Sequence, residues 1–378
     1  MDFNFSKAQL MLRKTVADFS ENVVKPRAEE IDRSGKFPKD LFLEMTKMGL
    51  TGIGTEEKYG GSGGSDIEKI IAVEEIAKYC GSTAATLSIH TIFASVIGKF
   101  GTEEQKQKYL PVVCSGGELG AFALTEPNAG SDAGGTETTA EDMGDYYLLN
   151  GNKIFITNGG EADVYVIFAL TTPNIGTRGI SALILEKGME GFGFGDHYDK
   201  LGIRSSATCE LIFNNVKVPK ANLLGKEGQG FKIAMATLDG GRIGIAAQAL
   251  GIAQGAFEEA VEYSKEREQF GKPIAAQQAI AFKIADMATK LRCARMLVYS
   301  AAELKEAHAP YGMESAMAKQ YASDVALEIT SEALQIFGGN GYLKGMPVER
   351  MYRDAKITEI YEGTSEIHKV VIAREVLK

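Results

Sequence analysis

The sequence predicts an α+β protein in three parts: an N-terminal helical domain, a middle antiparallel β domain and a C-terminal helical domain. The spacing of apolar residues carries this prediction. It changes from three- and four-residue steps to alternation near residue 118, and returns to helical steps near residue 228. With 378 residues, 44% of them hydrophobic, the chain is long enough for such domains and their buried cores.

Residues 1–117 are predicted to be helical. Ser6 is expected to cap the first helix, and Pro26 to end it. Between them, apolar residues recur at helical steps: Leu12, Val16, Phe19 and Val23. The segments FPKDLFLEMTKMGL and SDIEKIIAVEEIAKYC predict further helices, joined by the flexible Gly/Ser loop EKYGGSGGSD.

Residues 118–227 are predicted to form the β domain. In YYLLNGNKIFIT, Asn150-Gly151 lies between alternating apolar residues, which is a strong signal for a hairpin turn. The segments VYVIFAL, ISALILE and CELIFNNVKVP predict further strands. Parallel strands would need crossover helices, and the spacing leaves no room for them, so we expect antiparallel pairing.

Residues 228–378 are predicted to contain longer helices. The segment GRIGIAAQALGIAQGAFEEAVEYSKER is apolar on much of its surface, as expected inside a bundle or at a subunit interface. AFKIADMATKLRCARMLVYSAAELKE and ESAMAKQYASDVALEITSEALQIFGG are similar, and the latter is expected to stop at Gly338-Gly339.

Composition and missing motifs exclude several classes of protein. A net charge of −9 and a pI near 5.3 argue against a general nucleic-acid binder. The four cysteines are far apart, and no histidine lies in a metal-ligand spacing, so we expect reduced thiols and no metal site. The sequence shows no signal peptide and no apolar run long enough to span a membrane, which predicts a cytosolic protein.

Nucleotide and hydrolase motifs are missing as well. There is no GxGxxG between a strand and a helix, no P-loop and no GxSxG. Catalysis would therefore depend on carboxylates, or on a cofactor that supplies redox chemistry.

Some short motifs are weak signals when taken singly. The loop FALTEPNAGSD offers small and hydroxyl residues that suit an anion or a polar ring, but it is also good turn chemistry. Phe155 and Thr157 in KIFITNGG lie on one face of a predicted strand, which suits a flat heterocycle or simply a core. Arg267 and Phe270 in KEREQFG fit a cation at a helix end and a packed ring.

A glutamate before the last predicted helix is harder to explain structurally. In ITEIYEGTSEIHKVV, Glu366 falls in the first helical turn, where a carboxylate complements the helix dipole. Glu362 lies earlier and is followed by Gly363, which bends the chain. A helix-start role therefore explains Glu362 less well.

Taken together, six segments are specific: GAFALTEPNAGSDAG, LNGNKIFITNGG, DKLGIRSSAT, GFKIAMATLDGGRIGIAAQALGIAQ, QIFGGNGY and YRDAKITEIYEGTSEI. In this order and spacing, over nearly the whole chain, the sequence resembles the acyl-CoA dehydrogenase family, most closely the short-chain or butyryl-CoA dehydrogenases. The resemblance implies domains at 1–117, 118–227 and 228–378, the last a four-helix bundle. It also implies FAD held between the domains and a homotetramer built as a pair of dimers.

The resemblance implies that Glu362, in the YEGT motif, is the catalytic base. It would remove the α-proton of an acyl-CoA thioester while hydride passes from the β-carbon to flavin N5, giving a trans-2-enoyl-CoA. Burial should raise the pKa of this carboxylate, and its backbone N–H should bind the thioester carbonyl. Some relatives carry the base immediately before the arginine of GRIGIA, but here that position is Gly241.

The remaining site residues carry over by motif. The resemblance implies the following contacts with FAD: Phe122, Leu124, Thr125, Ser131, Phe155, Thr157, Arg267, Phe270, Gln278, Gln335, Gly338, Gly339, Thr364 and Glu366. Those at Arg267, Gln278 and 335–339 would reach partly across a subunit interface.

The acyl-CoA is expected to contact Ser131, Asp239, Arg242 and Gly363. Thr358, Gln254, Ile92 and Phe93 are expected to close the acyl pocket above a short tail, which gives a hypothesis of a C4–C6 preference.

The sequence is compatible with more than one function. The leading interpretation is a dehydrogenase that passes electrons to an electron-transferring flavoprotein. The same groups would serve a short enoyl-CoA reductase working in the opposite direction, either alone or within a bifurcating flavoprotein complex. An acyl-CoA oxidase, or an inactive acyl-CoA-binding scaffold, is less favoured.

Overall fold

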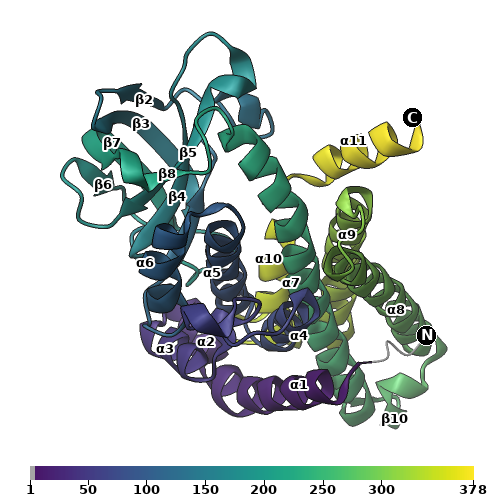
Figure 1. Cartoon of the computed structure of the whole chain (residues 1–378). Coiled ribbons are helices and arrows are strands. Elements are labelled where there is room, and N and C mark those ends of the chain that lie inside the picture. The colour runs from purple at the N-terminus through teal and green to yellow at the C-terminus, as the bar shows by residue number, and fades with distance from the viewer. Residues whose placement is uncertain (1–4) are drawn as a thin grey trace.

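The computed structural model describes residues 5–378, and its three parts follow the chain (Figure 1). The N-terminal helices (purple) lie beneath the β domain (teal), and the C-terminal helices (green to yellow) pack beside them. Residues 1–4, where the N-terminal domain is expected to begin, lie outside the described residues. The predicted α, β, α order is confirmed.

The N-terminal part consists of α-helices joined by short turns: α1 (Lys7–Phe19), α2 (Ala28–Ser34), α3 (Lys39–Lys47), α4 (Asp66–Ala77), α5 (Gly81–Phe100) and α6 (Glu103–Cys114). The predicted cap is confirmed, since Ser6 Oγ accepts a hydrogen bond from the Gln9 N–H at 3.1 Å. Helix α5 packs against α4, against strand β1 (Gly120–Ala123) and against the long C-terminal helix α7 (Gly230–Glu266), so it connects all three parts.

The expectation that Pro26 ends the helical run was wrong. After α1 the chain continues through a π-helical turn (Ser20–Val24) and a 3₁₀ turn (Lys25–Arg27) directly into α2. Pro26 lies at the start of the 3₁₀ turn, where its missing N–H costs no hydrogen bond and its fixed φ suits the helix.

The β domain is built on one mixed sheet. Its strands are β1, β2 (Thr139–Asp142), β3 (Tyr146–Thr157), β4 (Val164–Leu170), β5 (Ile180–Glu186), β6 (Phe192–Phe194), β7 (Thr208–Pro219) and β8 (Leu223–Leu224). They pair in the order β6-β7-β3-β2-β4-β5-β8, and most pairs are antiparallel as predicted. However, β1 pairs with β4 in parallel, because β2 and β3 form the crossover in place of a helix.

The hairpin predicted at Asn150-Gly151 was wrong. Strand β3 runs straight through both residues, and the register against β7 shifts there, which marks a β-bulge. Gly151 is needed because its φ is 134° and a Cβ would lie 2.7 Å from Thr138 Oγ1. The turn between β2 and β3 is instead made around Gly144, whose φ is 90°.

The C-terminal part is organised around helix α7. With α8 (Gln278–Glu306), α9 (Gly312–Phe337) and α10 (Pro347–Ile357) packed against it, α7 forms the predicted four-helix bundle. Its 37 residues extend about 55 Å, from the β domain to the short strands β9 (Glu268–Gln269) and β10 (Lys272–Pro273) (Figure 1). Helix α11 (Ser365–Val376) ends the chain. Across residues 5–378, no helix combines the length and apolarity needed to cross a membrane.

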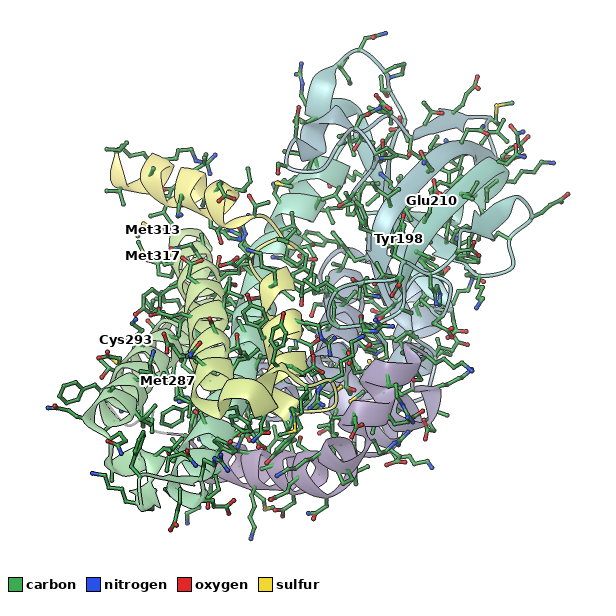
Figure 2. The ribbon with its side chains drawn as sticks, turned by 180° about the vertical axis from the view of Figure 1, so that it is seen from behind. Tyr198, Glu210, Met287, Cys293, Met313 and Met317 are labelled. Atoms are coloured by element: carbon green, nitrogen blue, oxygen red, sulfur yellow. The ribbon has the colours of Figure 1, made fainter. Side chains whose placement is uncertain are left out.

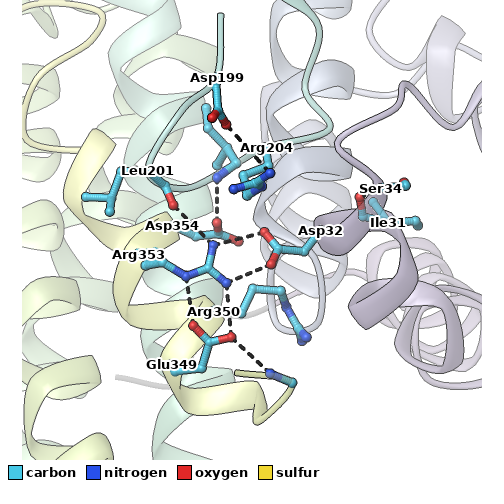
Figure 3. Close-up of polar contacts among 12 residues, drawn as sticks. Ile31, Asp32, Ser34, Asp199, Leu201, Arg204, Glu349, Arg350, Arg353 and Asp354 are labelled. Atoms are coloured by element: carbon cyan, nitrogen blue, oxygen red, sulfur yellow. Dashed lines mark hydrogen bonds and ion pairs between the residues drawn. The ribbon is translucent and has the colours of Figure 1, made fainter. Parts of the chain in front are cut away.

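A polar cluster around Arg353 joins the three parts (Figure 3). From α10, its guanidinium forms an ion pair with Asp32 of α2 at 2.7 Å and with Glu349 at 2.8 Å. It also donates a hydrogen bond to the carbonyl of Leu201, in the loop between β6 and β7, at 3.1 Å. A single side chain therefore fixes α2, α10 and a loop of the β domain relative to one another.

Replacing Arg353 with Met is expected to lower the free energy of unfolding by about 1–3 kcal/mol, less than for a fully buried pair because the Arg353 side chain is 20% exposed. The Asp32 and Glu349 side chains, 15% and 14% exposed, would be left close together without their cation. Urea unfolding followed by circular dichroism measures the change. Arg33→Met is the control, because the Arg33–Glu30 pair is 75% and 61% exposed and its loss should not be measurable. Equal stability of the two variants would contradict this account.

Candidate active site

The turn between α10 and α11 presents Glu362 in an unusual backbone conformation. Glu362 has φ 54° and Gly363 has φ 94°, so two successive residues adopt positive φ. A Cβ at position 363 would lie 3.0 Å from the buried His368 ring, which only glycine avoids. Thr364 then caps α11, as its Oγ1 accepts from the Ile367 N–H at 3.3 Å. Strain of this kind in a non-glycine residue is typical of functional sites.

The carboxylate of Glu362 lies on α7 at Gly241. A Cβ built on Gly241 would approach Glu362 Oε2 to 3.1 Å and Ile92 Cδ1 to 3.0 Å, so glycine leaves room for both groups. Oε2 is buried and has no hydrogen-bond partner within residues 5–378. A buried carboxylate oxygen without a donor is costly for structure and suits a group that accepts a proton.

Burial and nearby cations act in opposite directions on this carboxylate. Burial raises the pKa of Glu362, while the positive charges of Lys319 and Arg242 partly offset the rise. The predicted direction of the pKa shift is therefore found in the structure. A carboxylate is a more effective general base when its pKa lies closer to the operating pH, so the raised pKa of Glu362 suits a base near neutral pH.

Arg242 and Asp239 lie on α7 beside Gly241. Arg242 Nη1 and Asp239 Oδ1 are 2.7 Å apart, on one helix face at i and i+3. The Arg242 side chain is only 8% exposed, and its Nε is buried without a partner among the described residues. An arginine with a free donor at such a position can receive an anionic or carbonyl oxygen.

A cavity of about 110 Å³ adjoins the base, between α4, α5 and α7. Gly241 and Ile92 lie on its wall, which ties it to Glu362. Its lining also includes Asp66, whose Oδ1 is 2.8 Å from Lys305 Nζ and 3.3 Å from Lys69 Nζ. The cavity is small and carries charged groups, so an apolar tail has little room in it.

The expectation that Gln254, Thr358 and Phe93 close this pocket is not supported. Gln254 lies three helical turns beyond Arg242, and its Nε2 donates to Glu258 Oε1 at 2.7 Å. Thr358 is fully buried and its hydroxyl donates to the Ala355 carbonyl at 2.7 Å. Phe93 packs behind Gly120, where a Cβ would lie 2.6 Å from the ring. The resemblance to the family placed these residues at the pocket, but their side chains point elsewhere.

The β domain brings together one set of the residues predicted to bind FAD. Phe122 and Leu124 belong to the same apolar cluster as Ile92 of the cavity. The Thr125 carbonyl accepts from the Ile154 N–H at 2.9 Å, which joins the loop after β1 to the end of β3. Ser131 is exposed in the following loop.

Phe155 and Thr157 complete this set, on the less buried side of β3. Phe155 is 62% exposed and has φ 57°, and its ring lies 5.2 Å from that of Tyr198. Figure 2 shows Tyr198 on the β domain, near Glu210. An exposed aromatic ring in a strained backbone, beside a threonine, suits a flat heterocyclic ligand.

A second set of the predicted FAD residues lies far from Glu362. Its members are all exposed and gather where α7 ends and α8 begins and at the end of α9: Arg267, Phe270, Gln278, Gln335, Gly338 and Gly339. Arg267 follows Arg242 by roughly 25 residues of helix, or about 37 Å. Phe270 is 94% exposed with φ 55°. One copy of the chain therefore does not bring the two sets together.

Some site groups were not predicted from the sequence. Lys319 on α9 is fully buried and donates from Nζ to the Gly363 carbonyl at 2.6 Å. His368 is buried against Gly363. Under the loop after β1, Lys153 and Glu126 form a buried ion pair of 2.6 Å. Lysine is usually a surface residue. The one sign of burial in the sequence is that Lys319 lies between apolar residues in MAKQYA. Within the described chain, no cluster of acidic, histidine or cysteine side chains could hold a metal.

The comparisons with known proteins identify the domains of the chain. Models of the acyl-CoA dehydrogenase N-terminal, middle and C-terminal domains match residues 6–117, 121–216 and 228–377. Acryloyl-CoA reductase (NADH) of Anaerotignum propionicum is 58% identical over 380 residues, covering 100% of this chain and 96% of that protein.

Solved structures are similarly close. Butyryl-CoA dehydrogenase from Megasphaera elsdenii superposes with a TM-score of 0.98 at 52% identity, and 100% of both chains is covered. A chain from a structural study of the electron transferring flavoprotein of Acidaminococcus fermentans and flavin-based electron bifurcation reaches a TM-score of 0.99 at 55% identity, again over 100% of both chains. With its domain models matched in order and full-length relatives this similar, the chain belongs to the acyl-CoA dehydrogenase family.

Proposed function

We propose that this chain catalyses the FAD-dependent α,β-dehydrogenation of a short acyl-CoA, with Glu362 as the base. The observation that carries the proposal is the buried, unpartnered Glu362 Oε2 on a strained turn, beside a small cavity. No other carboxylate competes at the position next to Arg242, because Gly241 stands there.

The chain's own residues would act as follows. Glu362 removes the proton from the carbon next to the thioester, and its backbone N–H donates to the thioester carbonyl, where negative charge develops. A donor of this kind is worth about 3–4 kcal/mol in the transition state. Arg242, paired with Asp239, supplies a permanent cation to the CoA portion, and Ser131 and Gly363 are the further contacts we assign to the substrate.

The residues of the β domain fit FAD. The exposed, strained Phe155, the Thr157 hydroxyl and the loop at Leu124–Thr125 offer an aromatic surface and polar groups for its ring. When bound, FAD supplies the acceptor for the hydride from the β-carbon. We assign Thr364 and Glu366, at the start of α11, to the cofactor as well, the latter through its backbone.

A second copy of the chain would complete the cofactor site. The second set, the six exposed residues around the junction of α7 and α8 and the end of α9, is too distant to reach the same FAD from within one chain. We therefore propose an oligomer, a homotetramer built from two dimers, in which each copy lends these groups to its neighbour.

The reverse reaction is the second candidate. One relative is named an acryloyl-CoA reductase, and another, from Acetobacterium woodii, is named a subunit of a caffeyl-CoA reductase-Etf complex. The same base can return a proton to the α-carbon, so the geometry serves both directions. We propose an electron-transferring flavoprotein as the redox partner in either case.

Anaerobic titration of the FAD-loaded protein with butyryl-CoA and longer esters tests the proposed function. Butyryl-CoA should bleach the flavin absorbance, and bleaching should weaken beyond about six carbons because the cavity is small and carries charged groups. An oxidase would differ by rapid reoxidation in air. Failure to retain FAD, or no bleaching by any ester, would overturn the proposal.

Gly241→Ala is expected to lower kcat/KM for butyryl-CoA about tenfold or more, because the new Cβ would push Glu362 Oε2 or Ile92 by a few tenths of an ångström. Stability should not fall, since alanine favours a helix more than glycine does. Gly98→Ala on α5 is the matched control, as a Cβ there meets nothing within 4 Å. Equal kinetics of the two variants would contradict the assigned position of the base.

A further inference from the structure

We propose that Lys319 is a positioning residue for the base: its ammonium holds the 362–363 turn through the Gly363 carbonyl and supplies the positive charge that balances Glu362. The inference rests on the proposed function, and goes beyond it by naming what sets the conformation and protonation of Glu362. Lys319 itself does not touch the substrate or the cofactor in this account.

The burial of Lys319 is the first observation. Lysine is almost never fully buried without a partner. Lys319 has no exposed surface, and its Nζ lies 2.6 Å from the Gly363 carbonyl oxygen. The hydrogen bond goes to a backbone carbonyl within the turn and not to a carboxylate. Such a bond fixes the peptide between Gly363 and Thr364, one residue after Glu362.

The conformation of the turn is the second observation. Positive φ at a non-glycine residue costs of the order of 1–3 kcal/mol and persists only where neighbours enforce it. Glu362 has φ 54°, and the Lys319 bond acts on the adjacent residue. The N-cap of Thr364 holds the other end of the same turn. Lys319 therefore links the strained backbone to the rigid helix α9.

The charges around Glu362 are the third observation. Lys319 from α9 and Arg242 from α7 are the cations that lower the pKa of Glu362 against its burial. Arg242 is already paired with Asp239 and also faces Tyr311 and Arg374. Lys319 forms no ion pair with a carboxylate of residues 5–378, so it is the less compensated of the two cations.

The other groups that face Lys319 leave it charged near neutral pH. Burial lowers the pKa of Lys319 to about 8, with Arg242 adding to the effect and Glu362, Asp324 and Glu359 opposing it. His368, from α11, has its pKa lowered to about 3 by burial and by Lys319 and Arg242, so it stays neutral. Near pH 7 the turn is thus held by a charged lysine beside a neutral histidine.

The test is the pH profile of the anaerobic half-reaction, flavin bleaching by butyryl-CoA, in FAD-loaded variants. Removing the Lys319 charge removes an influence that lowers the pKa of Glu362, so that pKa must rise. In Lys319→Met the acidic limb of the rate profile should move up by about one pH unit or more. Lys319→Arg keeps the charge, and its limb should stay near that of the wild type.

Lys319→Gln separates the effect of the hydrogen bond to Gly363 from the effect of the positive charge. It keeps a donor for the Gly363 carbonyl but no charge, so it should show the same shift as Lys319→Met with a smaller loss of the plateau rate. If Lys319→Met fails to fold, Lys319→Gln still tests the loss of the charge, because its amide can donate the buried hydrogen bond to Gly363. Lys290→Met is the control. Lys290, on α8, forms an exposed ion pair with Glu328 of α9, and its loss should leave the pH profile unchanged.

The outcomes distinguish this inference from the proposed function. If the wild type is never bleached at any pH, the proposed function fails. If the wild type is bleached but the acidic limb does not move in folded Lys319→Met or Lys319→Gln, only the role of Lys319 is refuted. An equal shift in Lys319→Arg would also refute it, since the charge would then not be the cause.

Discussion

Glu362→Gln is expected to reduce the rate of flavin bleaching by butyryl-CoA about 10³-fold or more, the upper part of the range for a positioned general base. Glutamine keeps the shape of the side chain and its place at Gly241, but it cannot accept the proton. The structure offers no substitute, because Oε2 has no partner within the described chain and position 241 carries no side chain. Stopped-flow absorbance under anaerobic conditions measures the rate.

Ligand binding should survive this substitution. The contacts assigned to the CoA portion, Arg242 and Asp239, lie on α7 and do not depend on the charge of Glu362 for their 2.7 Å pairing. Binding of butyryl-CoA, followed by the perturbation of the flavin spectrum, should remain within a few-fold of the wild type. Glu375→Gln, at the far end of α11, is the control for a lost carboxylate. Bleaching by Glu362→Gln at a rate close to that of the control would remove Glu362 from the mechanism.

Lys153→Met is expected to lower the free energy of unfolding by about 3–5 kcal/mol, the cost of leaving a buried charge uncompensated. The side chains of Lys153 and Glu126 are 0% and 2% exposed, and their charged atoms lie 2.6 Å apart. Lys153 Nζ also donates to the Leu124 carbonyl at 3.0 Å, and Glu126 accepts from the backbone N–H of Thr138. The pair therefore ties the loop after β1 to β3, and its loss should also weaken FAD binding.

Removing both charges shows how much of the lost stability comes from leaving the Glu126 carboxylate unpaired. Because most of the cost comes from the unpaired Glu126 carboxylate, the double variant Lys153→Met/Glu126→Gln should recover at least half of the lost stability. Lys108→Met, whose pair with Glu186 is 57% and 39% exposed, is the control and should change stability far less. Urea unfolding of the FAD-loaded proteins gives the comparison. A double variant less stable than Lys153→Met would contradict this explanation.

The sequence predicted the fold class because apolar periodicity is local and strong. The prediction failed where pairing with a strand distant in the sequence determines the local structure. Asn150-Gly151 has the composition of a hairpin turn, yet pairing with β7 keeps β3 straight and absorbs Gly151 in a bulge. The parallel pairing of β1 and β4 joins segments more than 40 residues apart, and no nearby residue signals it.

The site shows the same division. Motifs pointed to Glu362, Arg242 and Phe155, and the structure gives Glu362 and Phe155 the strained backbones found at functional positions. Lys319 escaped prediction because it meets Gly363 only through the packing of α9 against the turn. Gln254 and Thr358 had suitable positions along the chain, but their side-chain hydrogen bonds turn them away from the cavity.

Exchange of the α-hydrogen with solvent tests the central claim most directly. The FAD-loaded protein would be incubated anaerobically with butyryl-CoA in D₂O, and deuterium at the second carbon of the acyl chain followed by mass spectrometry. If the carboxylate at position 362 takes and returns that proton, the wild type should incorporate deuterium and Glu362→Gln should not. Incorporation by Glu362→Gln as fast as by the wild type would show that another group is the base.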